Sequence, residues 1–345
     1  MKYLLVILIS ALLSTSAVAN YDDENLSTEA VLLFNEAMFG NAVSQVLLAH
    51  EFESGGLFPL NLEQSYYWYT RAAEQGVPLA MYQLGVMSKE GRGTQKNFEQ
   101  AIDWFIKADE LGYPPAPSQL GFMYFKGQGV PVDKEQAAYW FLKAAEQGIA
   151  EAQLNLAVMF SQGAGVAKDY QQAVYWYQKA AEQGNAWAQT NLGVRYANGE
   201  GVSKDARLAA YWYEQAAIQD LAAAQFNVAM AYKMGWGVIQ DQPRAIFWLQ
   251  EAAKQGHSDA QNNLAVAYFN GGWVDTNYTF AYTWMKVAVK GGSKQAQSGL
   301  EDAVSMLTPN VIVEADALAD ACYFSGFKDC PYQDIVLDKL ALQNY

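Results

Sequence analysis

The stretch YWYQKAAEQGNAWAQTNLGVRYANGEGV, Tyr175–Val202, contains the pattern that decides the fold. A tryptophan, a pair of alanines and a glycine are followed by a short helical pattern that ends in Gly-Glu-Gly. The tryptophan recurs every 36 residues, at positions 68, 104, 140, 176, 212, 248 and 284. Glycines recur with the same step at positions 55, 91, 127, 163, 199, 235 and 271. A fixed period of this size predicts seven copies of one supersecondary unit.

Each copy has the pattern of a helix–turn–helix. Ala188, Leu192 and Tyr196 recur at helical spacing and stop at Gly199, since glycine can adopt the left-handed conformation that ends a helix. A second helix is expected to open at a capping residue, in order Asn61, Asn97, Asp133, Asp169, Asp205, Asp241 and Asn277. In the first four copies a glutamine three residues later is expected to bond back to the cap's own amide. One such pair cannot bury its apolar face alone, so we predict an all-α fold, a right-handed α-solenoid of about seven stacked repeats.

The period and the ends of the chain predict the domain organisation. The seven repeats are expected over 44–295, as 44–79, 80–115, 116–151, 152–187, 188–223, 224–259 and 260–295. A capping helix is expected within 20–43, and further capping helices with a tail within 296–345. Residues 1–19 combine Lys2, an apolar run and a small-residue cleavage site ending at Ala19, which predicts a signal peptide and a periplasmic or secreted protein. That run is too short for stable membrane insertion.

Charge and cysteine usage narrow the function classes. The formal net charge of −14 disfavours nucleic acid and anionic lipid as partners. Cys322 and Cys330 are the two cysteines, and in an oxidising compartment they are most simply one disulfide. His50 and His257 are the two histidines, too few for a histidine metal site or a histidine-based triad. We therefore expect no catalytic residue, no metal and no cofactor.

The segment LGFMYFKGQGVPVDKEQAAYWFLKAAEQG, Leu120–Gly148, resembles the Sel1-like repeat, a relative of the tetratricopeptide repeat. The resemblance covers about residues 44–300. It implies a scaffold or adaptor, often in a bacterial envelope, that holds peptides or proteins against the solenoid surface. A cell-envelope protein is therefore the expected partner. A disulfide-pinned tail after the last repeat is also seen on other proteins of this type.

The helical wheel indicates where a partner would lie. Positions 3, 7 and 10 of each first helix lie opposite its buried stripe, on the side that lines the concave groove of a right-handed helical-hairpin solenoid. Apolar residues on an exposed face suggest a groove for a peptide or helix. The candidates are Tyr82, Phe122, Phe125, Phe226, Met230 and Phe269. The alternative is that superhelical curvature buries position 7 between neighbouring repeats.

Position 4 carries an amide in six successive repeats, namely Gln83, Gln119, Asn155, Asn191, Asn227 and Asn263. An amide both donates and accepts hydrogen bonds. These side chains either hold the backbone of a bound peptide, as an asparagine does in tetratricopeptide relatives, or bond to the adjacent repeat. Arg195 either pairs with a ligand carboxylate or is an ordinary surface charge. Glu200 is expected only to fill the variable slot between two glycines.

These patterns predict a non-enzymatic periplasmic scaffold or adaptor that binds a protein or peptide partner in the concave groove. The alternative is a cell-envelope enzyme or a carbohydrate-binding protein that acts on peptidoglycan. In that case exposed aromatic residues would stack on sugars, and Trp187, Trp236 and Trp273 are the candidates.

Overall fold

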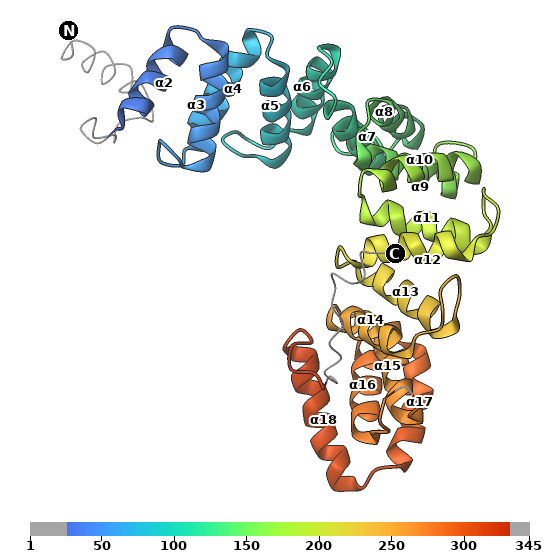
Figure 1. Cartoon of the computed structure of the whole chain (residues 1–345). Coiled ribbons are helices and arrows are strands. Elements are labelled where there is room, and N and C mark those ends of the chain that lie inside the picture. The colour runs from blue at the N-terminus through green and yellow to red at the C-terminus, as the bar shows by residue number, and fades with distance from the viewer. Residues whose placement is uncertain (1–25, 273, 332–345) are drawn as a thin grey trace. The chain divides into compact units, whose positions relative to one another are not determined.

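The computed structural model describes residues 26–272 and 274–331, and over these residues it contains helices and no strands (Figure 1). The predicted signal peptide, Trp273 and residues 332–345 lie outside the described residues. The chain divides into two compact units, Met1–Ile149 and Ala150–Tyr345. The prediction of an all-α repeat architecture is confirmed.

The first unit contains seven helices over its described residues. They are α2 (Thr28–Met38), α3 (Ala42–Ser54), α4 (Leu62–Glu74), α5 (Pro78–Glu90), α6 (Phe98–Glu110), α7 (Ala116–Lys126) and α8 (Lys134–Glu146). Helices α3 and α4, α5 and α6, and α7 and α8 form the tightly packed pairs of the repeats, and α2 packs on α3. Ser27 caps α2, since its hydroxyl accepts a hydrogen bond from the Ala30 amide.

The second unit continues the same pairing. Its helices are α9 (Ala150–Gln162), α10 (Tyr170–Glu182), α11 (Ala186–Asn198), α12 (Ala206–Ala217), α13 (Ala222–Met234), α14 (Gln242–Lys254), α15 (Ser258–Asn270), α16 (Tyr278–Lys290), α17 (Lys294–Ser305) and α18 (Pro309–Phe324). The repeat pairs are α9 with α10, α11 with α12, α13 with α14, and α15 with α16. Helices α17 and α18 both pack on α16 and cover the end of the stack (Figure 1).

All seven predicted caps of the second helices are confirmed, because each side chain accepts a hydrogen bond from an amide of the first turn. The reciprocal bond predicted from the following glutamines is wrong. The amide of Asn61 donates instead to the Phe52 carbonyl, and the amide of Asp133 donates to the Tyr124 carbonyl. The cap residue is thus tied to the first helix of its own repeat.

The Gly-x-Gly motif has two separate structural roles. Gly199 ends α11 in the left-handed conformation, with a φ of 76°. Gly201 lies against the start of α10 in the preceding repeat, where a Cβ atom would collide with the carbonyl of Tyr170. The motif is therefore a joint at which the backbones of two repeats meet.

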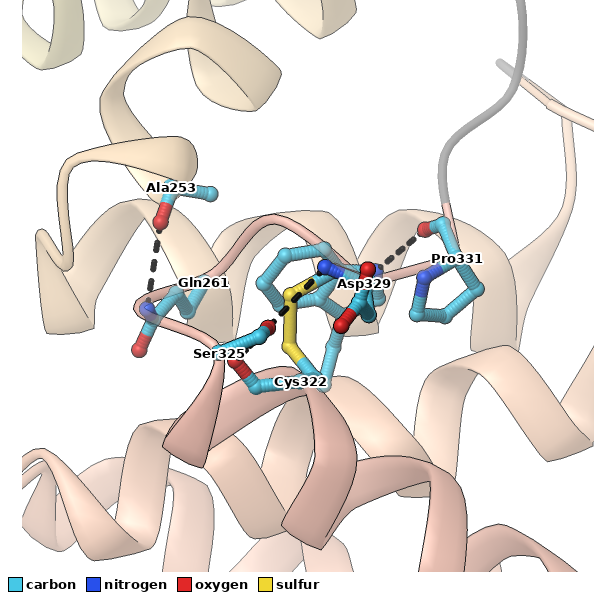
Figure 2. Close-up of a disulfide and its surroundings, with 8 residues drawn as sticks. Ala253, Gln261, Cys322, Ser325, Asp329 and Pro331 are labelled. Carbon is cyan, nitrogen blue, oxygen red and sulfur yellow. Dashed lines mark hydrogen bonds between the residues drawn. A yellow bond between two sulfur atoms is a disulfide. The ribbon is translucent and has the colours of Figure 1, made fainter.

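A ladder of buried glutamines, which the sequence reasoning missed, joins successive repeats. The side chains of Gln189, Gln225 and Gln261 donate to the carbonyl eight residues earlier; Figure 2 shows the bond from Gln261 to Ala253. The side-chain oxygens of Gln189 and Gln225 also accept from a glutamine thirty residues later, and the same bond joins two earlier pairs. The four pairs, donor first, are Gln75 to Gln45, Gln183 to Gln153, Gln219 to Gln189 and Gln255 to Gln225. The two glutamines of each pair occupy the same two positions of the repeat in all four pairs.

The predicted disulfide between Cys322 and Cys330 is confirmed, and it closes the turn after α18 (Figure 2). Beyond this turn, the Pro331 carbonyl accepts a hydrogen bond from the indole N–H of Trp284, with a nitrogen-to-oxygen distance of 2.9 Å. Trp284 is fully buried in α16. The disulfide-pinned turn therefore seals the core of the last repeat. Over the described residues, no helix combines the length and the apolarity that crossing a bilayer requires.

Candidate functional site

A cleft of about 410 Å³ lies between α11, α12 and α13 in the second unit. We name it the Trp236 cleft. It is lined by Ala197, Asn198, Lys204, Ala206, Ala209, Ala210, Tyr213, Asn227, Met230, Ala231 and Trp236. Asn227 and Met230 were predicted from the helical wheel as groove residues. Trp236 was predicted only for the carbohydrate alternative, and the structure brings it to the same cleft.

The equivalent place one repeat earlier is filled by side chains. Thirty-six residues before Ala206, Ala231 and Trp236 stand Tyr170, Arg195 and Glu200. The Arg195 guanidinium lies 5.1 Å from the centre of the Tyr170 ring and forms an ion pair with Glu200 at 2.5 Å. We name this cluster the filled site.

These contacts correct two expectations. Glu200 does more than fill a slot between glycines, because it is the ionic partner of Arg195. The Arg195 side chain is only 14% exposed, so it is not an ordinary surface charge, and its carboxylate partner comes from the loop that follows its helix. The Trp236 cleft is open because two methyl groups stand where the filled site has a tyrosine ring and an arginine.

Lys204 differs from the lysines at the same position of other repeats. The ammonium group of Lys96 lies 4.8 Å from the centre of the Phe98 ring, and that of Lys168 lies 4.6 Å from the Tyr170 ring. In both cases the ring belongs to the residue two positions later. After Lys204 that residue is Ala206, and Lys204 has neither a counter-ion nor an aromatic ring as a partner among the described residues.

Two of the six predicted position-4 amides are bridged by a lysine. Gln119 accepts a hydrogen bond from Lys89 at 2.8 Å, and Asn263 accepts one from Lys233 at 2.9 Å. In each case the lysine is at position 10 of the preceding repeat, which is thirty residues before the amide. Gln119 and Asn263 therefore bond to the adjacent repeat, which is the second of the two roles considered for these amides.

The other four amides divide into two groups. Asn155 and Asn191 donate to carbonyls of their own helices, those of Glu151 and Trp187. Gln83 and Asn227 make no hydrogen bond to any described residue. The residue thirty positions before Asn227 is an alanine of the cleft wall, so the lysine bridge is absent there. Among the described residues, Asn227 is the one of the six amides that lines the open cleft and makes no side-chain hydrogen bond.

The predicted apolar groove residues are mostly covered by neighbouring side chains. Phe122 packs edge-on against Phe141, with ring centres 5.1 Å apart. Phe226 stacks on His257 at the end of the same repeat, with ring centres 4.7 Å apart. Phe125 is the exception, with 40% of its surface exposed. The remaining pairs are Tyr82 with Tyr113 and Phe269 with Tyr278. Contacts with side chains of the same repeat therefore cover most of this stripe, and the predicted burial of position 7 between neighbouring repeats stays a prediction.

The Trp236 cleft presents mainly apolar, amide and hydroxyl groups, with one lysine at its edge. Burial raises the pKa of Tyr213 to about 12, so its hydroxyl stays protonated at neutral pH. The described residues of the lining include no carboxylate, histidine or cysteine. Over the described part of the chain, no group of three or more His, Cys, Asp or Glu residues is placed to hold a metal ion.

The repeat matches a known family along most of the chain. The family model described as Sel1 repeat matches residues 42–77, 78–113, 116–149, 150–185, 188–221, 222–257 and 258–293. The chain therefore belongs to the Sel1 repeat family. Proteins with this fold are generally scaffolds for protein interactions and typically non-catalytic.

Solved structures agree with this assignment. The chain is similar to c5321 of Escherichia coli, described as a protective antigen of uropathogenic strains with an SLR fold, at 31% identity, with 88% of this chain and 71% of that chain covered and a TM-score of 0.66. It is also similar to a Sel1 repeat protein of Oxalobacter formigenes, at 30% identity, with 86% and 84% covered and a TM-score of 0.66. A comparison with curated proteins finds no match.

Proposed function

We propose that this protein is an exported scaffold that binds a peptide segment of a partner protein at the Trp236 cleft. The observation that supports the proposal best is the state of Asn227, whose side-chain donor and acceptor bond to none of the described residues and which lines an open cleft. An amide of this kind matches the N–H and C=O pair of one peptide unit. The adjoining volume of about 410 Å³ is large enough to take a side chain of the same peptide.

A variant that fills the cleft tests this proposal. A206Y/A231R/W236E introduces the three residues that the preceding repeat holds at the same positions, so the helices are expected to keep their packing. A displayed peptide library would be selected on the wild-type protein, and the dissociation constants of the enriched peptides measured for both proteins. We expect the filled variant to bind at least about tenfold more weakly, because the side-chain site is lost.

The control is N191A, which removes the amide at the corresponding position of the filled site and should leave the dissociation constant unchanged. Equal affinity of the wild type and A206Y/A231R/W236E for every selected peptide would overturn the proposal. Circular dichroism of each variant would establish that the comparison is made between folded proteins.

Export is the second part of the proposal. The Cys322–Cys330 disulfide supports it, because such bonds persist in oxidising compartments. The predicted signal peptide over 1–19 supports it as well, and a cell-envelope protein is then the natural partner. Cell fractionation with mass spectrometry of the N-terminus would test it. We expect a periplasmic or secreted protein that begins after Ala19, whereas a cytoplasmic protein with an intact N-terminus would contradict it.

Carbohydrate binding is a second candidate because Trp236 is 56% exposed at the cleft. Trp187 is similarly exposed but does not line this cleft, and Trp273 lies outside the described residues. Soluble peptidoglycan fragments provide the test. Binding that is lost in W236A but retained in W187A, together with failure of the peptide selection, would replace the peptide proposal with the carbohydrate one.

A further inference from the structure

Building on the proposed function, we infer that the peptide carries a carboxylate next to an apolar side chain, and that Lys204 binds this carboxylate. The apolar side chain occupies the alanine-lined part of the Trp236 cleft. The inference rests on two differences between the cleft and other repeats, one in charge and one in volume.

The charge difference concerns Lys204. At the same repeat position the ammonium groups of Lys96 and Lys168 are each held over an aromatic ring of their own chain. Such contacts satisfy part of the charge. Ala206 gives Lys204 no ring, and none of the described residues that line the cleft is acidic. A cation that has no ionic or aromatic partner among the described residues, at the edge of a cleft whose other described residues are uncharged, is complementary to a carboxylate.

The volume difference concerns the cleft wall. In the filled site the ring of Tyr170 and the aliphatic stem of Arg195 occupy the space that Ala206 and Ala231 leave open. A leucine or phenylalanine side chain of a partner is similar in size to the groups that fill this space in the filled site. Met230 and Trp236 provide polarizable and aromatic surface for it to contact.

The carboxylate can come from an aspartate or glutamate side chain or from the end of a peptide chain. Both sources present the same two oxygens to the lysine, so the cleft chemistry alone does not separate them. Probes that differ only in the source of the carboxylate do separate them.

The experiment uses alanine–glycine peptides of six residues that carry one phenylalanine and an uncharged fluorophore. One set, amidated at the C-terminus, places aspartate or asparagine beside an internal phenylalanine. The other places phenylalanine last, with a free or an amidated C-terminus. Dissociation constants would be measured by fluorescence anisotropy with the wild type, K204Q and, as the matched control, K168Q, whose lysine is engaged with a ring.

We expect at least one carboxylate probe to bind about tenfold more tightly than its neutral counterpart, and only in the presence of Lys204. K204Q should remove this preference, and K168Q should retain it. The preferred probe should also bind more weakly as salt is raised. The probe set in which the preference appears identifies the source of the carboxylate.

The possible failures can be told apart. If the probes bind the wild type but not A206Y/A231R/W236E, and charge makes no difference, the carboxylate inference is overturned while the proposed function stands. If K204Q weakens charged and neutral probes equally, Lys204 acts through the fold and the inference is again overturned. If no probe or selected peptide distinguishes the wild type from the filled variant, the proposed function fails as well.

Discussion

The filled site and the Trp236 cleft occupy the same place in two successive repeats. Each contains residues of a second helix, of the first helix that follows it, and of the Gly-x-Gly loop after that first helix. They differ because Tyr170, Arg195 and Glu200 of one are alanine, alanine and tryptophan in the other. Backbone bonds and buried alanines maintain the stacking of the repeats. These three outer side chains can therefore differ between repeats while the helix pairing stays the same.

Emptying the filled site should have the largest effect. Tyr170 and Arg195 pack on each other, and removing both leaves Glu200 without its partner. We expect Y170A/R195A to lower the free energy of unfolding by about 3 kcal/mol, since it removes a half-buried ring and an arginine that is largely buried. Urea denaturation followed by circular dichroism measures this change.

The control for this variant is Q171A, which alters an exposed side chain on the first turn of the same helix. It should change the unfolding free energy by less than about 0.5 kcal/mol. A loss below about 1 kcal/mol in Y170A/R195A would show that the cluster fills space without stabilising the stack, and the contrast with the cleft would lose its energetic basis.

Filling the cleft is the reverse experiment. We expect A206Y/A231R/W236E to raise the free energy of unfolding by about 1–2 kcal/mol, because the new ring and arginine stem bury apolar surface. W236E alone provides the glutamate without its arginine and should not stabilise. A filled variant that is less stable than the wild type would mean that the two places differ in backbone as well as in side chains.

The period, the caps and the joint glycines could be predicted from the sequence, because turn and cap chemistry is local and repeats in step with the tryptophans. The contacts of the position-4 amides could not be predicted from the helical wheel. Whether such an amide is bridged depends on the residue thirty positions earlier, Lys233 before Asn263 but an alanine before Asn227. The helical wheel does not predict the ion pair of Arg195 with Glu200 either, because Glu200 lies beyond the end of the helix. The loop glycines bring its carboxylate back over the helix end.

The glutamine ladder offers a second comparison between repeats. Gln225 accepts a hydrogen bond from Gln255, but the corresponding residue for Gln261 is Gly291. The side-chain oxygen of Gln261 is buried and has no hydrogen-bond partner among the described residues. Gly291 has a φ of −76°, which any residue can adopt, and a Cβ atom there would lie 3.6 Å from that oxygen. We expect G291Q to stabilise the protein by about 1 kcal/mol in urea denaturation.

G291A is the matched control for this variant, because it restricts the unfolded backbone in the same way but provides no donor. G291Q should therefore be the more stable of the two. Equal stability would show that the gain comes from the backbone alone and that the ladder bond adds nothing at the end of the stack.

The smallest expected effect concerns the cap of α15. Nδ1 of His257 accepts a hydrogen bond from the Ala260 amide, where the cap of α11 uses the amide oxygen of Asn185. Burial lowers the pKa of His257 below its ordinary value of 6.5, although the neighbouring Asp259 opposes the shift. The unfolded chain thus binds the proton more readily. The stabilising contribution is complete above pH 6.5 and is lost as the pH falls through the folded-state pKa.

Asparagine makes the same cap without titrating between pH 7 and pH 5, so H257N isolates this effect from the carboxylates. We expect the wild type to lose about 0.5 kcal/mol more than H257N over that range, because the protonated imidazole cannot accept the Ala260 bond. Urea denaturation at both pH values measures the difference. Parallel losses in the two proteins would mean that the cap survives protonation, and that the imidazole contributes to the stack through its contact with Phe226 rather than through the helix end.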